Sequence, residues 1–157
     1  MTTRLLFVCL GNICRSPLAE AAFRVEAERL GLDVEADSAG TGGWHAGAPP
    51  DRRAIAAALR NGVDIGQLRA RKVIPADFDR FDHILALDED NLADLEALRP
   101  ASSRARLTML LDHVPGRAGE AVADPYYGGA AQFDATWRDV GEAARWLAQK
   151  LVEERTV

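Results

Sequence analysis

The chain lacks several features that would assign it to other protein classes. Only two of its 157 residues are cysteine, too few for a disulfide framework, so both are expected as free thiols. Its N-terminal apolar run, Leu5 to Leu10, is six residues long, which is far too short for a membrane span or a signal peptide. We therefore expect an unexported, cytoplasmic protein that does not enter a membrane.

The chain also has fewer basic than acidic residues. Acidic residues outnumber basic residues by 24 to 19, and the basic residues are scattered, which argues against nucleic acid as a partner. The three histidines, His45, His83 and His113, show no metal-ligand spacing, so we expect no metal and no other cofactor. With 157 residues, of which 48% are hydrophobic, the chain suits a single domain over residues 1–157.

Apolar segments with strand character alternate with helical patterns along the chain. Strands are expected at residues 5–9, 34–39, 81–87 and 106–111, and the first is apolar throughout, as in a strand buried on both faces. Helices are expected from Ser16, over 51–60, around 92–98 and over a long terminal segment with one apolar stripe. This alternation predicts a three-layer α/β domain, a parallel sheet with helices on both faces and its ligand at the carboxyl ends of the strands.

The loop after the first strand suits a phosphate group. Its sequence, CLGNICRS, separates Cys9 from Arg15 by five residues and leads directly into a helix. Backbone N–H groups of such a loop and of the helix start point inward, and the helix dipole adds partial positive charge, so a phosphate dianion fits there. Arg15 is expected to contact the phosphate through two N–H groups. The candidate phosphate-binding residues are Leu10, Gly11, Asn12, Ile13, Cys14, Arg15 and Ser16.

The same electrostatic field favours the thiolate form of a cysteine at the start of the loop, which makes Cys9 the expected nucleophile. Gly11 lets the backbone approach the anion closely, and Asn12 tolerates an unusual backbone torsion. Ser16 is placed to donate to the Cys9 sulfur. Taken singly, Cys9 suits a buried strand and Arg15 a surface position, but their combination before a helix favours the phosphate loop. A nucleotide-binding P-loop is excluded because the glycine-lysine-serine/threonine ending is missing.

Three segments together resemble a known family. VCLGNICRSP near the N-terminus, DSAGTGGWHAG in the middle and DPYYG late in the chain are similar to the low-molecular-weight protein tyrosine phosphatases. The resemblance covers essentially the full length and implies a four-stranded parallel sheet with helices on both faces. It also implies hydrolysis of protein phosphotyrosine and small aryl phosphates through a phosphocysteine intermediate on Cys9.

The resemblance assigns roles to single residues. Asp124 matches the general acid that protonates the leaving phenolate, and Trp44 matches a position that varies with specificity. Ser38 matches a serine that hydrogen-bonds to the loop asparagine, here Asn12. Cys14 matches a second cysteine that traps the oxidised nucleophile as a reversible disulfide. An aromatic substrate needs flat apolar walls, and these are expected from Ile13, Trp44, Tyr126 and Tyr127.

The sequence departs from the family in one respect and leaves other functions open. Some members have a histidine that completes the polar network of the loop, where this chain has Gln67 or Leu68. Arsenate reductases share the loop but need two further cysteines, and a phosphoarginine phosphatase has threonine where Ile13 stands. A non-catalytic phosphoprotein-binding module is a third alternative. The expected partner is a phosphotyrosine-bearing protein, and the habit of the family adds a tyrosine kinase.

Overall fold

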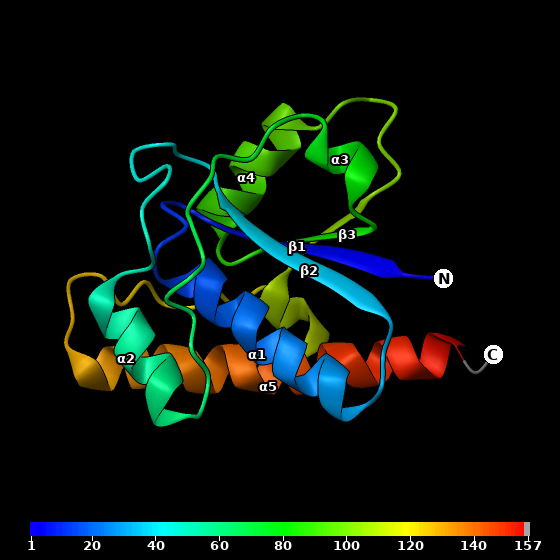
Figure 1. The fold of residues 1–157 in the computed structure, drawn as a ribbon. Helices are drawn as coiled ribbons and strands as arrows, with labels where there is room; N and C mark the ends of the chain where they lie inside the picture. The colour runs from blue at the N-terminus through cyan, green and yellow to red at the C-terminus, as the bar shows by residue number, and fades with distance from the viewer. Residues whose placement is uncertain (156–157) are drawn as a thin grey trace.

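A four-stranded parallel sheet forms the centre of the molecule (Figure 1). The computed structural model describes residues 1–155. The strands lie in the order β2-β1-β3-β4, and each pairs with its neighbours in parallel. Their bounds are Thr3–Cys9 for β1, Val34–Gly40 for β2, His83–Ala86 for β3 and Arg106–Met109 for β4. The predicted parallel α/β fold is confirmed.

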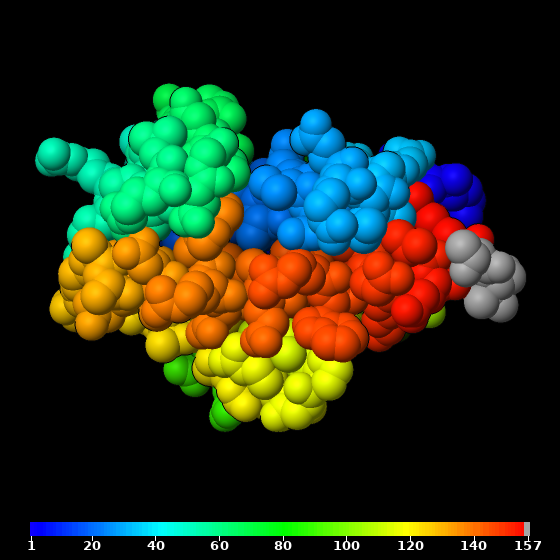
Figure 2. Space-filling view, turned by 90° about the horizontal axis from the view of Figure 1, so that it is seen from below, coloured from blue at the N-terminus to red at the C-terminus, as the bar shows by residue number. Residues whose placement is uncertain are grey.

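Helices cover both faces of this sheet. On one face lie α1 (Arg15–Arg29), α2 (Arg52–Arg60) and α5 (Ala130–Arg155). On the other lie α3 (Asp77–Arg80) and α4 (Glu89–Leu98), as Figure 1 shows. Figure 2 shows α5 running along its face of the molecule, with α1 packed beside it.

The central position of β1, covered on both faces, explains why its sequence is apolar without alternation. Leu5 and Phe7 belong to the core cluster under α1, α2 and α5, whereas Leu6 and Val8 belong to the cluster under α3 and α4. All four side chains are buried, since successive residues of a strand point to opposite faces and both faces are covered.

Three details of the predicted secondary structure were wrong. The fourth strand ends at Met109 because the Asp112 carboxylate accepts a hydrogen bond from the Met109 N–H, and Leu110–His113 forms a 3₁₀ helix instead. The third strand starts later than expected, since the Phe81 N–H still donates to Asp77 of the unforeseen α3. Ser16 does not cap α1: the helix begins at Arg15, and no side chain caps it.

The strand order reverses direction at the carboxyl end of β1, which is where parallel α/β sheets bind their ligands. There β2 lies on one side and β3 on the other, so the chain leaves neighbouring strands in opposite directions and opens a crevice between the loops. The loop after β1 begins at this point. None of the helices within residues 1–155 has the length and apolar character that crossing a membrane requires.

Candidate active site

The loop after β1 is held in a tight turn. Asn12 has a φ of 58°, the left-handed conformation that asparagine tolerates better than other non-glycine residues. Its N–H donates to the Cys9 Sγ at 3.3 Å, so the loop folds back over the sulfur. The end of β2 supports the turn closely, because a Cβ at Gly40 would lie 2.8 Å from the Leu10 carbonyl oxygen. This approach requires glycine at position 40.

Backbone donors of the loop are left free. Within residues 1–155, the N–H groups of Gly11, Ile13 and Cys14 have no protein hydrogen-bond acceptor, and the first turn of α1 adds further unpaired N–H groups. Unpaired donors of this kind at a helix start attract anions. The candidate phosphate-binding residues from Leu10 to Ser16 therefore form one cradle of donors around the Cys9 sulfur.

A directed chain of hydrogen bonds reaches the Cys9 sulfur. The Arg71 N–H donates to Asn12 Oδ1 at 3.0 Å, which fixes the orientation of the Asn12 amide. Asn12 Nδ2 then donates to Ser16 Oγ at 2.8 Å and to Ser38 Oγ at 3.0 Å. Since Ser16 Oγ accepts from Asn12, its own hydrogen is left for Cys9 Sγ, 3.0 Å away. The geometry thus stabilises negative charge on the sulfur.

Glu20 ends a branch of this network that passes through Ser38, and no motif in the sequence pointed to it. Ser38 Oγ donates to Glu20 Oε1 at 2.8 Å, and Arg24 forms an ion pair with the same carboxylate. Burial raises the pKa of Glu20 above its usual range. Gln67 is exposed and Leu68 packs its apolar side chain against the core, so neither replaces the histidine of other members. A charged residue among the alanines of α1, one turn after the loop, was the available signal.

Arg15 is buried beneath the loop and held from two distant segments. Its Nη1 donates to Asp88 Oδ2 at 2.7 Å and to the Val122 carbonyl at 3.0 Å. These contacts orient the guanidinium, and Nη2 lies 3.8 Å from Asp124 Oδ2. Asp88, to which no sequence motif pointed, follows β3 and caps α4 by accepting from the Asn91 N–H.

Asp124 starts a pair of turns at the rim. Its Oδ1 accepts from the Tyr126 N–H at 3.1 Å, and the Gly128 N–H donates to the Pro125 carbonyl. The Asp124 side chain is 46% exposed. Its carboxylate therefore lies beside Arg15 and is open to solvent.

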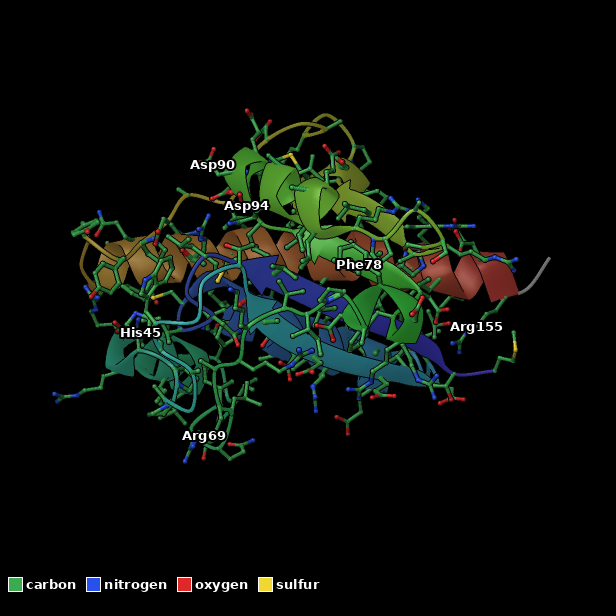
Figure 3. All side chains as sticks on the ribbon, turned by 90° about the horizontal axis from the view of Figure 1, so that it is seen from above. His45, Arg69, Phe78, Asp90, Asp94 and Arg155 are labelled. Atoms are coloured by element: carbon green, nitrogen blue, oxygen red, sulfur yellow. The ribbon has the colours of Figure 1, made fainter. Side chains whose placement is uncertain are left out.

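These groups line one cavity of about 240 Å³ at the carboxyl end of β1. The lining residues are Cys9, Leu10, Gly11, Ile13, Cys14, Arg15, Trp44, His45, Asp124, Tyr126 and Tyr127. In Figure 3, His45 marks this end of the sheet and Arg155 the opposite end. His45 is a lining residue that was not expected from the sequence. Its ring lies over the loop, 3.2 Å from where a Cβ at Gly11 would be. Ser38 lies behind the cavity, in the network described above.

Trp44 forms the outer wall of the cavity. A Cβ on Gly42 would lie 1.8 Å from the Trp44 ring, so the ring packs directly on the backbone of its own loop. The ring remains 73% exposed, and Tyr127 is 96% exposed. Large aromatic surfaces left in solvent at a cavity mouth are available for a ligand.

Comparisons with known proteins agree with this geometry. The family model described as low molecular weight phosphotyrosine protein phosphatase matches residues 4–157. The chain belongs to this family. The low molecular weight phosphotyrosine protein phosphatase of Schizosaccharomyces pombe is 44% identical over 133 residues, covering 83% of this chain and 85% of the relative. The human protein of the same description is 37% identical over 153 residues, covering 95% and 96%. The solved structure of YfkJ from Bacillus subtilis superposes with a TM-score of 0.90 at 37% identity, covering 98% and 97%.

The second cysteine of this family member differs in character from a reactive thiol. Cys14 is buried beside Cys9, and both are free. Burial raises the pKa of Cys14 to about 12, and the nearby Asp51 carboxylate adds to the effect. Cys14 is therefore a protonated thiol and a weak nucleophile at neutral pH.

We expect iodoacetamide at pH 8 to alkylate the folded phosphatase once, at Cys9. With a pKa of about 12, Cys14 is thiolate in only about one molecule in 10⁴ at that pH. Mass spectrometry of the peptides identifies the modified residue, and inorganic phosphate should slow the reaction. In about 8 M urea, which should unfold the protein, both cysteines should react. Rapid alkylation of Cys14 in the folded protein would contradict its high pKa.

Replacement of Ser38 by alanine is expected to lower the free energy of unfolding by about 1–3 kcal/mol, since the buried Glu20 carboxylate loses a hydrogen bond. Burial raises the pKa of Glu20 in the folded state. Glu20 therefore stabilises the folded protein at low pH, where its carboxyl is protonated, and this stabilisation is lost as the pH rises through the folded-state pKa. The Ser38 hydrogen bond favours the ionised form and limits this loss. The cost of Ser38→Ala should therefore shrink as the pH falls, in urea titrations at several pH values. Ser102→Ala, at an exposed position, is the control.

Proposed function

We propose that this protein hydrolyses protein phosphotyrosine through a phosphocysteine intermediate on Cys9. The observation that carries the proposal is the meeting of Cys9, the free loop amides, Arg15 and Asp124 in one cavity. These groups supply a nucleophile, an anion cradle and a proton donor, which are the requirements for displacement at a phosphate monoester. The family match supports the same reaction class.

The reaction would proceed in two displacements at phosphorus. The Cys9 thiolate attacks phosphorus, the bond to the tyrosine oxygen breaks, and Asp124 gives that oxygen a proton. Asp124 then removes a proton from water, whose oxygen attacks the phosphocysteine and releases the Cys9 thiolate. Ser16, 3.0 Å from the sulfur, stabilises the thiolate in both steps. Arg15 and the loop amides hold the phosphoryl oxygens throughout.

The walls of the cavity favour an aryl ester. Trp44, Tyr126 and Tyr127 offer flat faces, and Ile13 adds an apolar side chain next to the loop. Ile13 also argues against phosphoarginine, whose phosphatase has threonine at that position. An arsenate reductase is disfavoured because the chain has only two cysteines.

The test is hydrolysis of a phosphotyrosine peptide and of p-nitrophenyl phosphate in the presence of EDTA. We expect turnover of both, and little turnover of a phosphoarginine peptide of the same sequence. Preference for the phosphoarginine peptide would overturn the substrate assignment. Binding of the phosphotyrosine peptide without turnover would instead identify a phosphoprotein-binding module.

The pair of cysteines supports a redox brake on this reaction. Peroxide would oxidise the Cys9 thiolate to a sulfenic acid, and the neutral Cys14 thiol would displace water from it to form a disulfide. A thiol reductant would restore activity. Two free cysteines also suit a reducing compartment, so we place the protein in the cytoplasm as one domain over residues 1–157. A tyrosine kinase is the proposed source of its phosphorylated substrate.

A further inference from the structure

We propose that Arg53 is a positioning residue for the proton donor Asp124, although it does not line the cavity. The inference rests on the proposed role of Asp124 as general acid. Arg53 lies in the first turn of α2, which Figure 1 shows beside the start of α5. From there it contacts two segments of the protein: the one that carries Asp124 and the one that leads into α2.

A bidentate ion pair fixes the Arg53 guanidinium. Its Nε donates to Asp51 Oδ1 at 3.0 Å, and its Nη2 donates to Asp51 Oδ2 at 3.0 Å. Asp51 is itself anchored, because its N–H donates to the Ile13 carbonyl of the phosphate loop at 2.8 Å. Two parallel hydrogen bonds leave a planar fork little freedom. The guanidinium is therefore held at a fixed position relative to the loop that would bind phosphate.

The remaining nitrogen of this fork, Nη1, is directed to the acid segment, residues 124–129. Arg53 Nη1 donates to the Gly128 carbonyl oxygen at 2.9 Å. The Arg53 Cζ also lies 5.5 Å from the centre of the Tyr126 ring and 4.7 Å from that of Phe133, both within the range of cation–π attraction. One side chain thus contacts the segment at two residues that follow Asp124.

Before it enters α5, the acid segment has few other hydrogen bonds to the body of the protein. At its end, the Gly129 N–H donates to Gln132 Oε1, and the Gly129 carbonyl accepts from the Gln132 N–H in the first turn of α5. Upstream, the Val122 N–H donates to the Leu87 carbonyl, and the Val122 carbonyl accepts from Arg15. For the residues between Val122 and Gly128, the structure of residues 1–155 shows only hydrogen bonds that close turns within the segment itself. A general acid must stand within about 3 Å of the atom it protonates. Arg15 upstream and Arg53 downstream thus restrain the residues on either side of Asp124 and keep its carboxyl at the cavity rim.

The experiment compares two substrates that need the acid to different degrees. Phenyl phosphate has a poor leaving group that requires protonation, whereas p-nitrophenyl phosphate has a good one. The ratio of kcat/KM for the two substrates therefore reports on proton donation, and a general loss of structure would not change it. Asp124→Ala sets the upper limit of the change in this ratio.

We expect Arg53→Met to lower kcat/KM for phenyl phosphate by about tenfold to 10²-fold, within the range of general acid catalysis. For p-nitrophenyl phosphate we expect a loss of less than about threefold. Arg53→Lys, which keeps the charge but loses the fork, should shift the ratio in the same direction. In the Asp124→Ala background, Arg53→Met should add no further change in the ratio.

The matched control is Arg60→Met. Arg60 lies on the same helix and bonds Asp134 of α5 at 2.6 Å, but the structure shows it making no hydrogen bond to the acid segment within residues 1–155. Its ratio should equal that of the wild type. An unchanged ratio in Arg53→Met and Arg53→Lys, beside a large change in Asp124→Ala, would overturn the inference alone. An unchanged ratio in Asp124→Ala would overturn the proposed acid itself.

Discussion

Replacement of Cys9 by serine is expected to abolish turnover of aryl phosphates, with a loss of about 10³-fold or more in kcat. A serine hydroxyl has the size of the thiol but does not ionise near neutral pH. The bonds that approach the sulfur from Ser16 and the Asn12 N–H stabilise an anion that the hydroxyl does not form. The cradle of backbone N–H groups and Arg15 should survive the substitution.

Steady-state kinetics with p-nitrophenyl phosphate measures this loss, and calorimetry with a phosphotyrosine peptide measures whether binding is retained. The matched control is Cys14→Ser, in which the loop amides are kept and a buried, protonated thiol is replaced. We expect its loss of kcat to be far smaller than that of Cys9→Ser. A Cys9→Ser protein with substantial turnover would remove the nucleophile from the proposed mechanism.

Replacement of Asp124 by alanine is expected to lower kcat/KM for phenyl phosphate by about 10² to 10⁴-fold. The carboxyl lies beside Arg15 and is open to solvent at the cavity, and it is the proton donor that we propose for the leaving oxygen. Without it, the phenolate must leave as an anion. Binding of vanadate, which depends on the phosphate loop, should persist.

The comparison requires a second aspartate of similar exposure that lies outside the cavity. Asp134 meets this need, since it pairs with Arg60 on the surface between α2 and α5. Asp134→Ala should change kcat/KM less than about twofold, as expected of a surface pair. If Asp124→Ala were equally mild, another group would have to protonate the leaving oxygen.

The local part of the site was predictable because it is a contiguous stretch of chain. Cys9, the loop and the start of α1 follow one another in sequence, and a strand that enters a glycine-containing loop before a helix has few ways to fold. The same holds for the aromatic rim, since Trp44 and the two tyrosines stand in loops rich in glycine and proline. Patterns of this length need no knowledge of distant contacts.

The contacts that hold Arg15 and Arg53 were not predictable for the opposite reason. Arg15 meets Asp88 and the Val122 carbonyl, which lie 73 and 107 positions away in the sequence. Arg53 meets Gly128 across 75 positions. Such pairs depend on which strands are neighbours in the sheet, and no spacing within the sequence encodes that order.

By itself, the sequence determined the four strands and the longer helices, their alternation and the residues of the phosphate loop, because burial on both faces and helical spacing leave a direct pattern of residue types. The tertiary structure alone decided what surrounds that loop. The order β2-β1-β3-β4 brings the end of β3 beside the end of β1, so that Asp88 reaches Arg15. It also made Glu20, instead of a histidine, the end of the branch that runs from Asn12 through Ser38. Hydrogen bonds form between groups that folding brings within about 3 Å, and that proximity is a property of the packed sheet and helices.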